Sequence, residues 1–202
     1  MRLLEHLIAW IRGMALLRHP ELVRELGELR LEVNVLNRLR AACPGSVVDR
    51  GVVLIGFVPD RCGVGTHTRI NRGTVLAFGD TAGGYGRIVV GARTWIGQYN
   101  NLRVSAGGNI RIGDDCLISQ FCTLVTAGHG KVRGTLIREQ APNVEGDIII
   151  GSDVWLGAGV TVLPGVNVGD GAIVGANSVV NAVVPAGEIW AGTPARKIGM
   201  RE

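Results

Sequence analysis

One of the four histidines stands where it could support catalysis. His129 lies between Gly128 and Gly130 in TAGHGKVRG, at the point where a regular repeat of the sequence stops. Flanking glycines permit sharp turns and close approach of a substrate to the backbone. A hydroxyl group is a weak nucleophile at neutral pH, and histidine, with an ordinary pKa near ~6.5, can accept its proton. We therefore interpret His129 as a general base, with an exposed loop histidine as the alternative.

Other chemistries find less support in the residue types. His6 and His19 fall in a helical segment, and His67 falls at an outward position of the repeat. No closely spaced histidine pair or zinc-like cysteine spacing suggests a metal site, and no G-x-S-x-G turn suggests a serine hydrolase. The net charge of +4 suits a phosphate-bearing small ligand, and no Lys/Arg run indicates nucleic acid. We expect no metal and no nucleic acid.

A six-residue period organises most of the chain and must position these residues. The period matches neither an α-helix nor a simple alternating strand, and it is typical of a parallel β-helix in which each hexad forms one side of a triangular coil. Small residues recur four positions after the aliphatic residues and are expected to point inward. Cys62, Cys116 and Cys122 occupy such positions and are interpreted as buried packing residues. Asn100 occupies one as well, so its polar side chain would need a hydrogen-bond partner. The aliphatic positions, all Ile, Leu or Val, are Val52, Val58, Val64, Ile70, Leu76, Val90, Ile96, Leu102, Ile112, Ile118, Leu124, Ile150, Leu156, Val162, Val168, Val174 and Val180.

The period fails in three places, which are insertions at 77–89, 103–111 and 126–149. Counting sides of the coil places all three after the same side, so we expect them to leave from one corner and to build the binding face. His129 stands in the third insertion. Acceptor choice is expected to reside in these segments.

The N-terminal segment reads differently. Residues 2–18 and the stretch after Pro20 have helical periodicity, the second with a heptad-like seam of Leu22, Leu26, Leu29, Val33 and Leu36. We expect a helical hairpin over 1–45, a β-helix over 46–190 and a tail over 191–202. A surface for a partner protein or a membrane, formed by residues 1–41, is the alternative to simple packing of the hairpin. No 18-residue uncharged apolar run occurs and the start is a poor signal peptide, so a cytoplasmic location is expected.

Three motifs together resemble one family. TAGH before the inserted segment, IGSDVWLGAGVTVLPGVNVGDGAIVGANSVV after it and the later AGTPARKI are similar to the hexapeptide-repeat acyltransferases. The branch resembled contains galactoside, maltose, xenobiotic and polysaccharide O-acetyltransferases, over about residues 60–199. The resemblance implies an all-β fold, a left-handed parallel β-helix, that forms homotrimers and holds acetyl-CoA in a cleft between neighbouring coils.

The resemblance also implies roles for individual residues. His129 matches the catalytic histidine, and Tyr99 or Asn101 loosely matches the acceptor-binding position. Where many relatives read V-T-K-D-V-P, this chain reads VNAVVP over 180–185, so one lysine contact to a CoA phosphate is missing. The residues matched to the CoA site are Trp155, Gly157, Ala158, Ala176, Thr193, Arg196 and Lys197.

The resulting hypothesis is an acetyl-CoA-dependent O-acetyltransferase acting on a sugar hydroxyl, in a precursor of a surface polysaccharide or glycolipid. An N-acetyltransferase acting on a nucleotide-linked amino sugar is one alternative. A non-catalytic β-helix scaffold whose helical arm recruits a partner is another. A serine acetyltransferase would need a far larger helical N-terminal domain than the segment before Ser46.

Overall fold

The computed structural model describes residues 8, 10, 12–14, 19–81, 83–105, 107–144 and 146–202. The chain divides into two compact units, residues 1–37 and 38–202. The first predicted helix, over 2–18, lies largely outside the described residues, and the stretch after Pro20 forms helix α2 (Pro20–Ala42). No helix among the described residues is long and apolar enough to cross a membrane.

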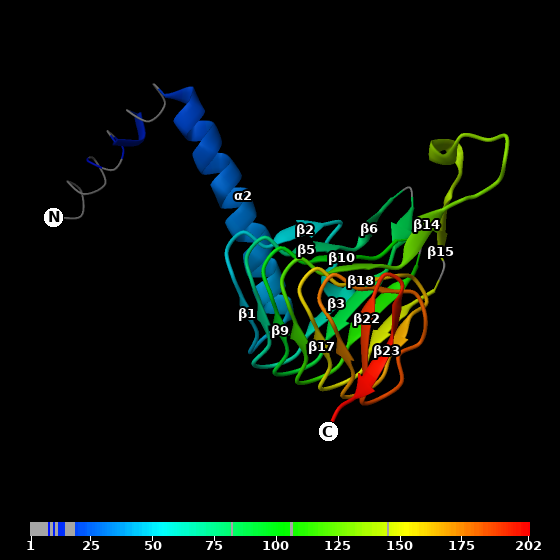
Figure 1. Cartoon of the computed structure of the whole chain (residues 1–202). Helices are drawn as coiled ribbons and strands as arrows, with labels where there is room; N and C mark the ends of the chain where they lie inside the picture. The colour runs from blue at the N-terminus through cyan, green and yellow to red at the C-terminus, as the bar shows by residue number, and fades with distance from the viewer. Residues whose placement is uncertain are drawn as a thin grey trace. The chain divides into compact units, whose positions relative to one another are not determined.

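The second unit is a parallel β-helix, as the six-residue period predicts, and it is left-handed, as the family resemblance implies (Figure 1). Its coils stack three sheets, which we call sheets I, II and III. Sheet I contains β1 (Val47–Val48), β4 (Arg69–Ile70), β9 (Trp95–Ile96), β12 (Leu117–Ile118), β17 (Trp155–Leu156), β20 (Ile173–Val174), β22 (Glu188–Gly192) and, antiparallel at its end, β23 (Ala195–Met200). Sheet II contains β2 (Val53–Ile55), β5 (Val75–Ala77), β10 (Asn101–Arg103), β13 (Thr123–Val125), β18 (Thr161–Val162) and β21 (Val179–Val180). Sheet III contains β3 (Cys62–Val64), β8 (Arg87–Val90), β11 (Asn109–Ile112), β16 (Ile148–Ile150) and β19 (Asn167–Val168).

The core is a column of aliphatic side chains inside the coils. From Val64 to Val180, every predicted hexad position is at most 8% exposed. Cys116 and Cys122 are fully buried, and Asn100 finds the partners it needs, because Nδ2 donates to the Gly97 carbonyl at 2.9 Å and Oδ1 accepts from the Cys122 amide at 2.7 Å. The period therefore specifies the interior of each coil.

The register of the first coil differs from the sequence prediction. The positions that continue the core column are Val48, which pairs with Ile70, and Leu54, which pairs with Leu76. The predicted positions were Val52, which instead occupies the small buried slot, and Val58, which is only half-buried. The prediction was wrong because a short 3₁₀ turn, η1 (Pro59–Arg61), lengthens the connection before β3. In the valine-rich sequence around it, either register buries aliphatic side chains.

The corners of the coils use backbone conformations with positive φ. The corner between sheets III and I places His67, Arg93, Asp115 and Asp153 at φ of 54–61°. The corner between sheets I and II does the same with Tyr99, Phe121 and Asn177, at φ of 55–62°. The left-handed region is costly for most residues and free for glycine, which explains the glycines at the equivalent corner positions.

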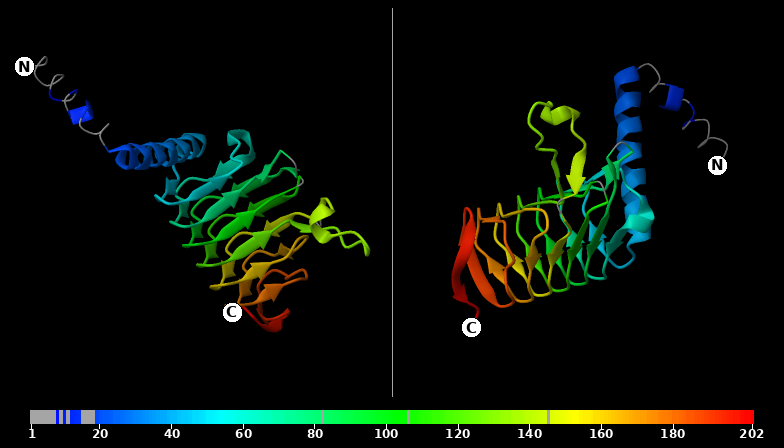
Figure 2. Two further views of the ribbon diagram at one scale, coloured as in Figure 1. Left: turned by 90° about the horizontal axis from the view of Figure 1, so that it is seen from above. Right: turned by 90° about the vertical axis from the view of Figure 1, so that its right-hand side faces the viewer.

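The corner between sheets II and III does not follow this pattern. The segments 77–89, 103–111 and 126–149 all join a strand of sheet II to the next strand of sheet III. The first forms a hairpin of β6 (Gly79–Asp80) and β7 (Gly84–Tyr85), and the third a longer hairpin of β14 (Ala127–His129) and β15 (Pro142–Val144). The third also contains the 3₁₀ turn η2 (Ile137–Glu139) and projects from the side of the stack (Figure 2).

Candidate active site

An open pocket of about 220 Å³ lies at the II–III corner. Each insertion contributes to its lining, with Ala77 and Gly79 from the first, Arg103 and Ser105 from the second, and His129 from the third. Because three stacked insertions meet there, the pocket has a mixed wall of strand ends and loop residues. It is a site that a regular coil could not form.

His129 is the last residue of β14 and its side chain is exposed. Its backbone pairs with Pro142 across the hairpin. His129 also lines a second, more open pocket of about 540 Å³ that is formed by residues of the third insertion between 129 and 140. His129 therefore contributes to the lining of both pockets.

Gln140 holds the loop that carries His129. Its Nε2 donates to the carbonyl oxygens of Val132 and Thr135, at 3.0 Å each, and its Oε1 accepts from the Val132 amide at 2.9 Å. The Gln140 side chain also lies against Gly130, where a Cβ would come within 2.4 Å of Oε1. The sequence analysis did not single out this residue, since a glutamine in an irregular segment has no periodic signal. Gln140 positions the loop through its side-chain amide.

The two proposed acceptor residues lie outside the 220 Å³ pocket. Tyr99 sits at the I–II corner, where its ring stacks on that of Phe121 with centroids 5.5 Å apart and planes at 6°. Asn101 begins β10 on the outer face of sheet II, and its Oδ1 is buried without a hydrogen-bond partner among the described residues. Arg103, two residues further along the same face, does line the pocket. Strand alternation after Asn101 could have pointed to it.

Apart from Trp155, the residues matched to the CoA site gather along the I–II corner and the end of the β-helix. The Asn177 amide donates to the Ala158 carbonyl at 2.8 Å, and Thr193 Oγ1 donates to the Asn177 carbonyl at 3.2 Å. Gly157 packs so closely on Ala176 that a Cβ would lie 2.6 Å from the Ala176 nitrogen. Trp155 stands on the outer face of sheet I, 49% exposed, with Nε1 donating to Ser119 Oγ at 3.3 Å.

Two basic residues stand near the end of this corner on β23. Lys197 Nζ lies 2.6 Å from Glu188 Oε1, and this contact, with a second hydrogen bond from Trp190, lowers the pKa of the Glu188 carboxyl. The Arg196 guanidinium donates to its neighbour Ala195 at 2.7 Å and is otherwise exposed. Arg196 is therefore the more available cation for a phosphate, because Lys197 already has a carboxylate partner.

Within the described part of one chain, His129 and three of the CoA-site matches lie at different corners of the coil. His129 belongs to the II–III corner, whereas Gly157, Ala158 and Ala176 belong to the I–II corner. The two sets lie at opposite edges of sheet II. The sequence motif alone gave no indication of this separation.

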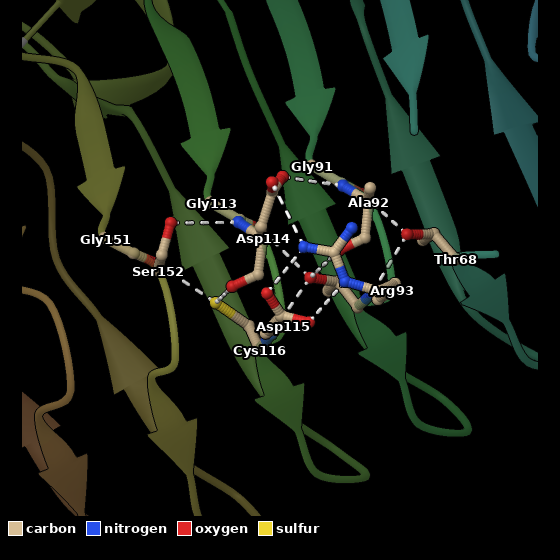
Figure 3. Close-up of polar contacts among 11 residues, drawn as sticks. Thr68, Gly91, Ala92, Arg93, Gly113, Asp114, Asp115, Cys116, Gly151 and Ser152 are labelled. Carbon is tan, nitrogen blue, oxygen red and sulfur yellow. Dashed lines mark hydrogen bonds and ion pairs between the residues drawn. The ribbon is translucent and has the colours of Figure 1, made fainter. Parts of the chain in front are cut away.

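At the III–I corner, charged residues form ion pairs between adjacent coils. Figure 3 shows Arg93 facing Asp114 and Asp115, with Arg93 Nε and Nη2 each 2.7 Å from an Asp115 carboxylate oxygen. This contact lowers the pKa of Asp115. Among the described residues, no group of three or more His, Cys, Asp or Glu side chains could hold a metal ion.

Comparison with known proteins bears on this site. The family model described as bacterial transferase hexapeptide, of six repeats, matches residues 147–182. Residues 147–182 are hexapeptide repeats. They cover strands of all three sheets after the third insertion. A search of curated protein sequences returns no match.

Solved structures share the fold over most of the chain. AntD from Bacillus cereus, an N-acyltransferase in complex with dTDP and 3-hydroxybutyryl-CoA, has a TM-score of 0.66 at 22% identity, over 79% of this chain and 82% of that one. The polySia-specific acetyltransferase NeuO has a TM-score of 0.51 at 27% identity, over 77% and 71%. A hexapeptide-repeat acetyltransferase of Vibrio cholerae O1 biovar eltor, complexed with acetyl coenzyme A, has a TM-score of 0.49 at 27% identity, over 79% and 67%.

Proposed function

We propose that this chain is an acetyl-CoA-dependent O-acetyltransferase that acts on a sugar hydroxyl. The observation that carries the proposal is the position of His129, exposed in a pocket that three stacked insertions form beside hexapeptide repeats. The similarity to NeuO, an acetyltransferase named for a sugar polymer, supports the same reaction class. The acceptor would be a precursor of a surface polysaccharide or glycolipid.

In the proposed mechanism His129 is the general base. The imidazole takes the proton of the acceptor hydroxyl as the hydroxyl oxygen bonds to the thioester carbonyl carbon, and it returns that proton to the departing CoA sulfur. His129 lines two pockets, and we propose that the acceptor occupies the one at the II–III corner. Gln140 keeps the loop in the conformation that presents the ring.

The complete site would form between neighbouring chains of a homotrimer. One chain would supply the II–III corner with His129, and its neighbour the I–II corner with Gly157, Ala158 and Ala176. This arrangement explains why a single chain keeps the two sets apart. Exposed apolar side chains support it, since Leu117, Phe121 and Trp155 are 49–60% exposed on and beside sheet I, and such patches mark interaction surfaces.

The I–II corner fits a CoA chain. Its backbone is closely stacked from Gly157 to Ala176, so an extended pantetheine arm could lie along it without displacing side chains. Arg196 has an exposed guanidinium for the phosphates, and Lys197 could join it by exchanging Glu188 for a phosphate. These contacts would compensate for the lysine that the VNAVVP segment lacks.

Replacing His129 with Ala tests the proposal. Loss of the base should lower turnover by about 10²–10⁴-fold, measured by release of the CoA thiol with hydroxyl and amine acceptors. His67→Asn is the matched control, because His67 lies at a different corner with φ of 61°, which asparagine tolerates. CoA binding and the sedimentation coefficient should not change in either variant.

Three outcomes would count against the proposal. Retention of most of the turnover by His129→Ala would exclude this histidine as the base. Turnover of amino sugars without turnover of their hydroxyl counterparts would favour the N-acetyltransferase alternative. Absence of CoA binding by the parent chain in calorimetry would favour a scaffold.

A further inference from the structure

Arg103 brings an unpaired positive charge into the pocket of His129. It is the last residue of β10, and its register partners on the adjacent coils are Ala77 and Val125. Its side chain is exposed and lines the pocket with Ser105 and His129. Because its neighbours on either side are small or aliphatic, they offer the guanidinium no acceptor.

The rest of the pocket lining contains no opposite charge. Among the described lining residues there is no Asp or Glu, and Arg103 is the only side chain with a permanent charge. Its guanidinium makes no hydrogen bond or ion pair with any other described residue. Other surface arginines of the β-helix do find carboxylates, such as Arg69 with Asp49 at 3.1 Å and Arg201 with Asp153 at 2.6 Å.

We infer that Arg103 selects an acceptor that carries an anionic group, either a sugar carboxylate or a sugar phosphate. A guanidinium presents paired N–H donors that match the oxygens of both groups, and it remains charged at any physiological pH. With the anion on Arg103, a hydroxyl elsewhere on the same sugar could reach His129, which lines the same pocket. This inference rests on the proposed function and names the acceptor class for it.

The test compares three acceptors that differ only in charge: a neutral hexoside, the corresponding uronic acid and the corresponding hexose phosphate. The parent enzyme should favour one or both anionic acceptors. Arg103→Gln should lower kcat/KM for the favoured acceptor by about 10–100-fold, mainly through KM, since losing a charged hydrogen bond costs about 1.5–3 kcal/mol. The loss of kcat/KM for the neutral hexoside should be much smaller than the loss for the anionic acceptor. The kcat/KM of Arg103→Lys for the favoured acceptor should lie between those of the parent and Arg103→Gln, because lysine keeps the charge and loses the paired donors.

The preferred acceptor distinguishes carboxylate from phosphate recognition. Arg87→Gln is the matched control, as it removes an exposed arginine of sheet III outside this pocket. An equal loss for neutral and anionic acceptors in Arg103→Gln, or an equal loss in the control, would overturn the inference. If the parent chain turns over none of the three acceptors, saturation-transfer NMR with the uronic acid and the hexose phosphate tests the role of Arg103 separately from the proposed acetyltransferase function. Binding lost in Arg103→Gln supports the role of Arg103, and absence of binding to the parent overturns it.

A second, independent observation concerns α2. Four of its five seam positions, Leu22, Leu26, Leu29 and Val33, alternate by four and three residues and are 39–59% exposed, whereas the fifth, Leu36, is 4% exposed. In heptad terms Leu22 and Leu29 occupy d positions and Leu26 and Val33 occupy a positions. An exposed seam of this kind is a surface for another helix, because each side chain can insert between those of a partner.

The charges beside the seam match a second copy of the same helix. Glu25 falls at a g position and Arg30 at the following e position, the two positions that face each other between parallel helices in register. The sequence of α2 contains four Glu and four Arg, whereas helices that lie on membranes are rich in positive charge. We propose that α2 forms a parallel coiled coil with α2 of another copy of this chain.

Cysteine cross-linking of the full chain tests the coiled coil. Leu29→Cys, at a seam position, should form a covalent dimer on mild oxidation, whereas Arg24→Cys, on the outside of the helix, should form little. The four native cysteines are buried and should not interfere. The difference in cross-linking between Leu29→Cys and Arg24→Cys reports which face of α2 lies against another helix. It therefore tests the coiled coil independently of whether the β-helix forms a trimer. Equal cross-linking of the two variants, or binding of α2 to anionic vesicles in place of cross-linking, would overturn the proposal.

Discussion

The two corners on either side of sheet III differ in how closely they follow the repeat. At the III–I corner each coil copies the one below it. Thr68 Oγ1 donates to the Gly91 carbonyl at 2.6 Å, Thr94 Oγ1 to the Gly113 carbonyl at 2.9 Å, and Cys116 Sγ to the Gly151 carbonyl at 3.0 Å (Figure 3). The side chains at this corner satisfy the backbone of the next coil.

At the II–III corner the same backbone departs from the stack. The three insertions leave there, and Thr126, although buried, has no hydrogen-bond partner for Oγ1 among the described residues. The comparison shows how one repeat can supply both rigidity and a site. Where side chains connect consecutive coils, insertion is costly, and where they do not, loops can vary and carry reactive groups.

The largest loss of stability is expected where an added side chain would clash with the backbone of the next coil at the III–I corner. A Cβ at Gly113 would lie 2.6 Å from the Gly151 carbonyl oxygen and carbon, so the backbone of the next coil must move. Gly113→Ala should lower the free energy of unfolding by about 3 kcal/mol, measured by denaturant titration. Gly63→Ala is the matched control, because its nearest contacts are Val89 methyl groups at 3.6 and 3.7 Å, and it should change stability by less than about 0.5 kcal/mol. Similar losses in both would show that the corner is not the rigid element.

A smaller effect separates the hydroxyl groups of the two corners. Thr94→Val removes a buried hydroxyl that donates to Gly113 and accepts from the Cys116 amide at 3.0 Å. Leaving both backbone groups unpaired should cost about 1–3 kcal/mol. Thr126→Val removes a hydroxyl without a described partner and should leave stability unchanged or raised. Thermal unfolding of the two variants beside the parent would measure the contrast, and an equal loss would contradict it.

The smallest effect concerns the exposed ion pair of the III–I corner. Arg93 lowers the pKa of Asp115 in the folded chain relative to the unfolded chain. Ionised Asp115 therefore adds stability above its unfolded pKa, about 3.9, and this contribution is lost as the pH falls through the folded value. Asp115→Asn should lower the melting temperature slightly at pH 7, and the difference should vanish in strong acid. A difference that grows on acidification would have the wrong sign.

The fold could be predicted from the sequence because the six-residue period is local. Each aliphatic residue from Val64 to Val180 points into the coil, and after each insertion the count of six starts again at a buried aliphatic residue. The first coil was misassigned because Val48, Val52 and Leu54 offer two registers of similar apolar burial. Only pairing with Ile70 and Leu76 decides between them.

The sequence by itself determined the coils, the common corner of the three insertions and the position of His129 at the last of them. The tertiary structure decided what surrounds that histidine. Arg103 reaches the pocket because β10 lies beside β13, and Gln140 holds the loop through contacts that follow no period. Trp155 and Ala176, which the family resemblance assigns to the same active site as His129, lie at other parts of the coil. A period specifies which side of the chain is buried, whereas a pocket depends on which coils become neighbours, and that is a property of the stack.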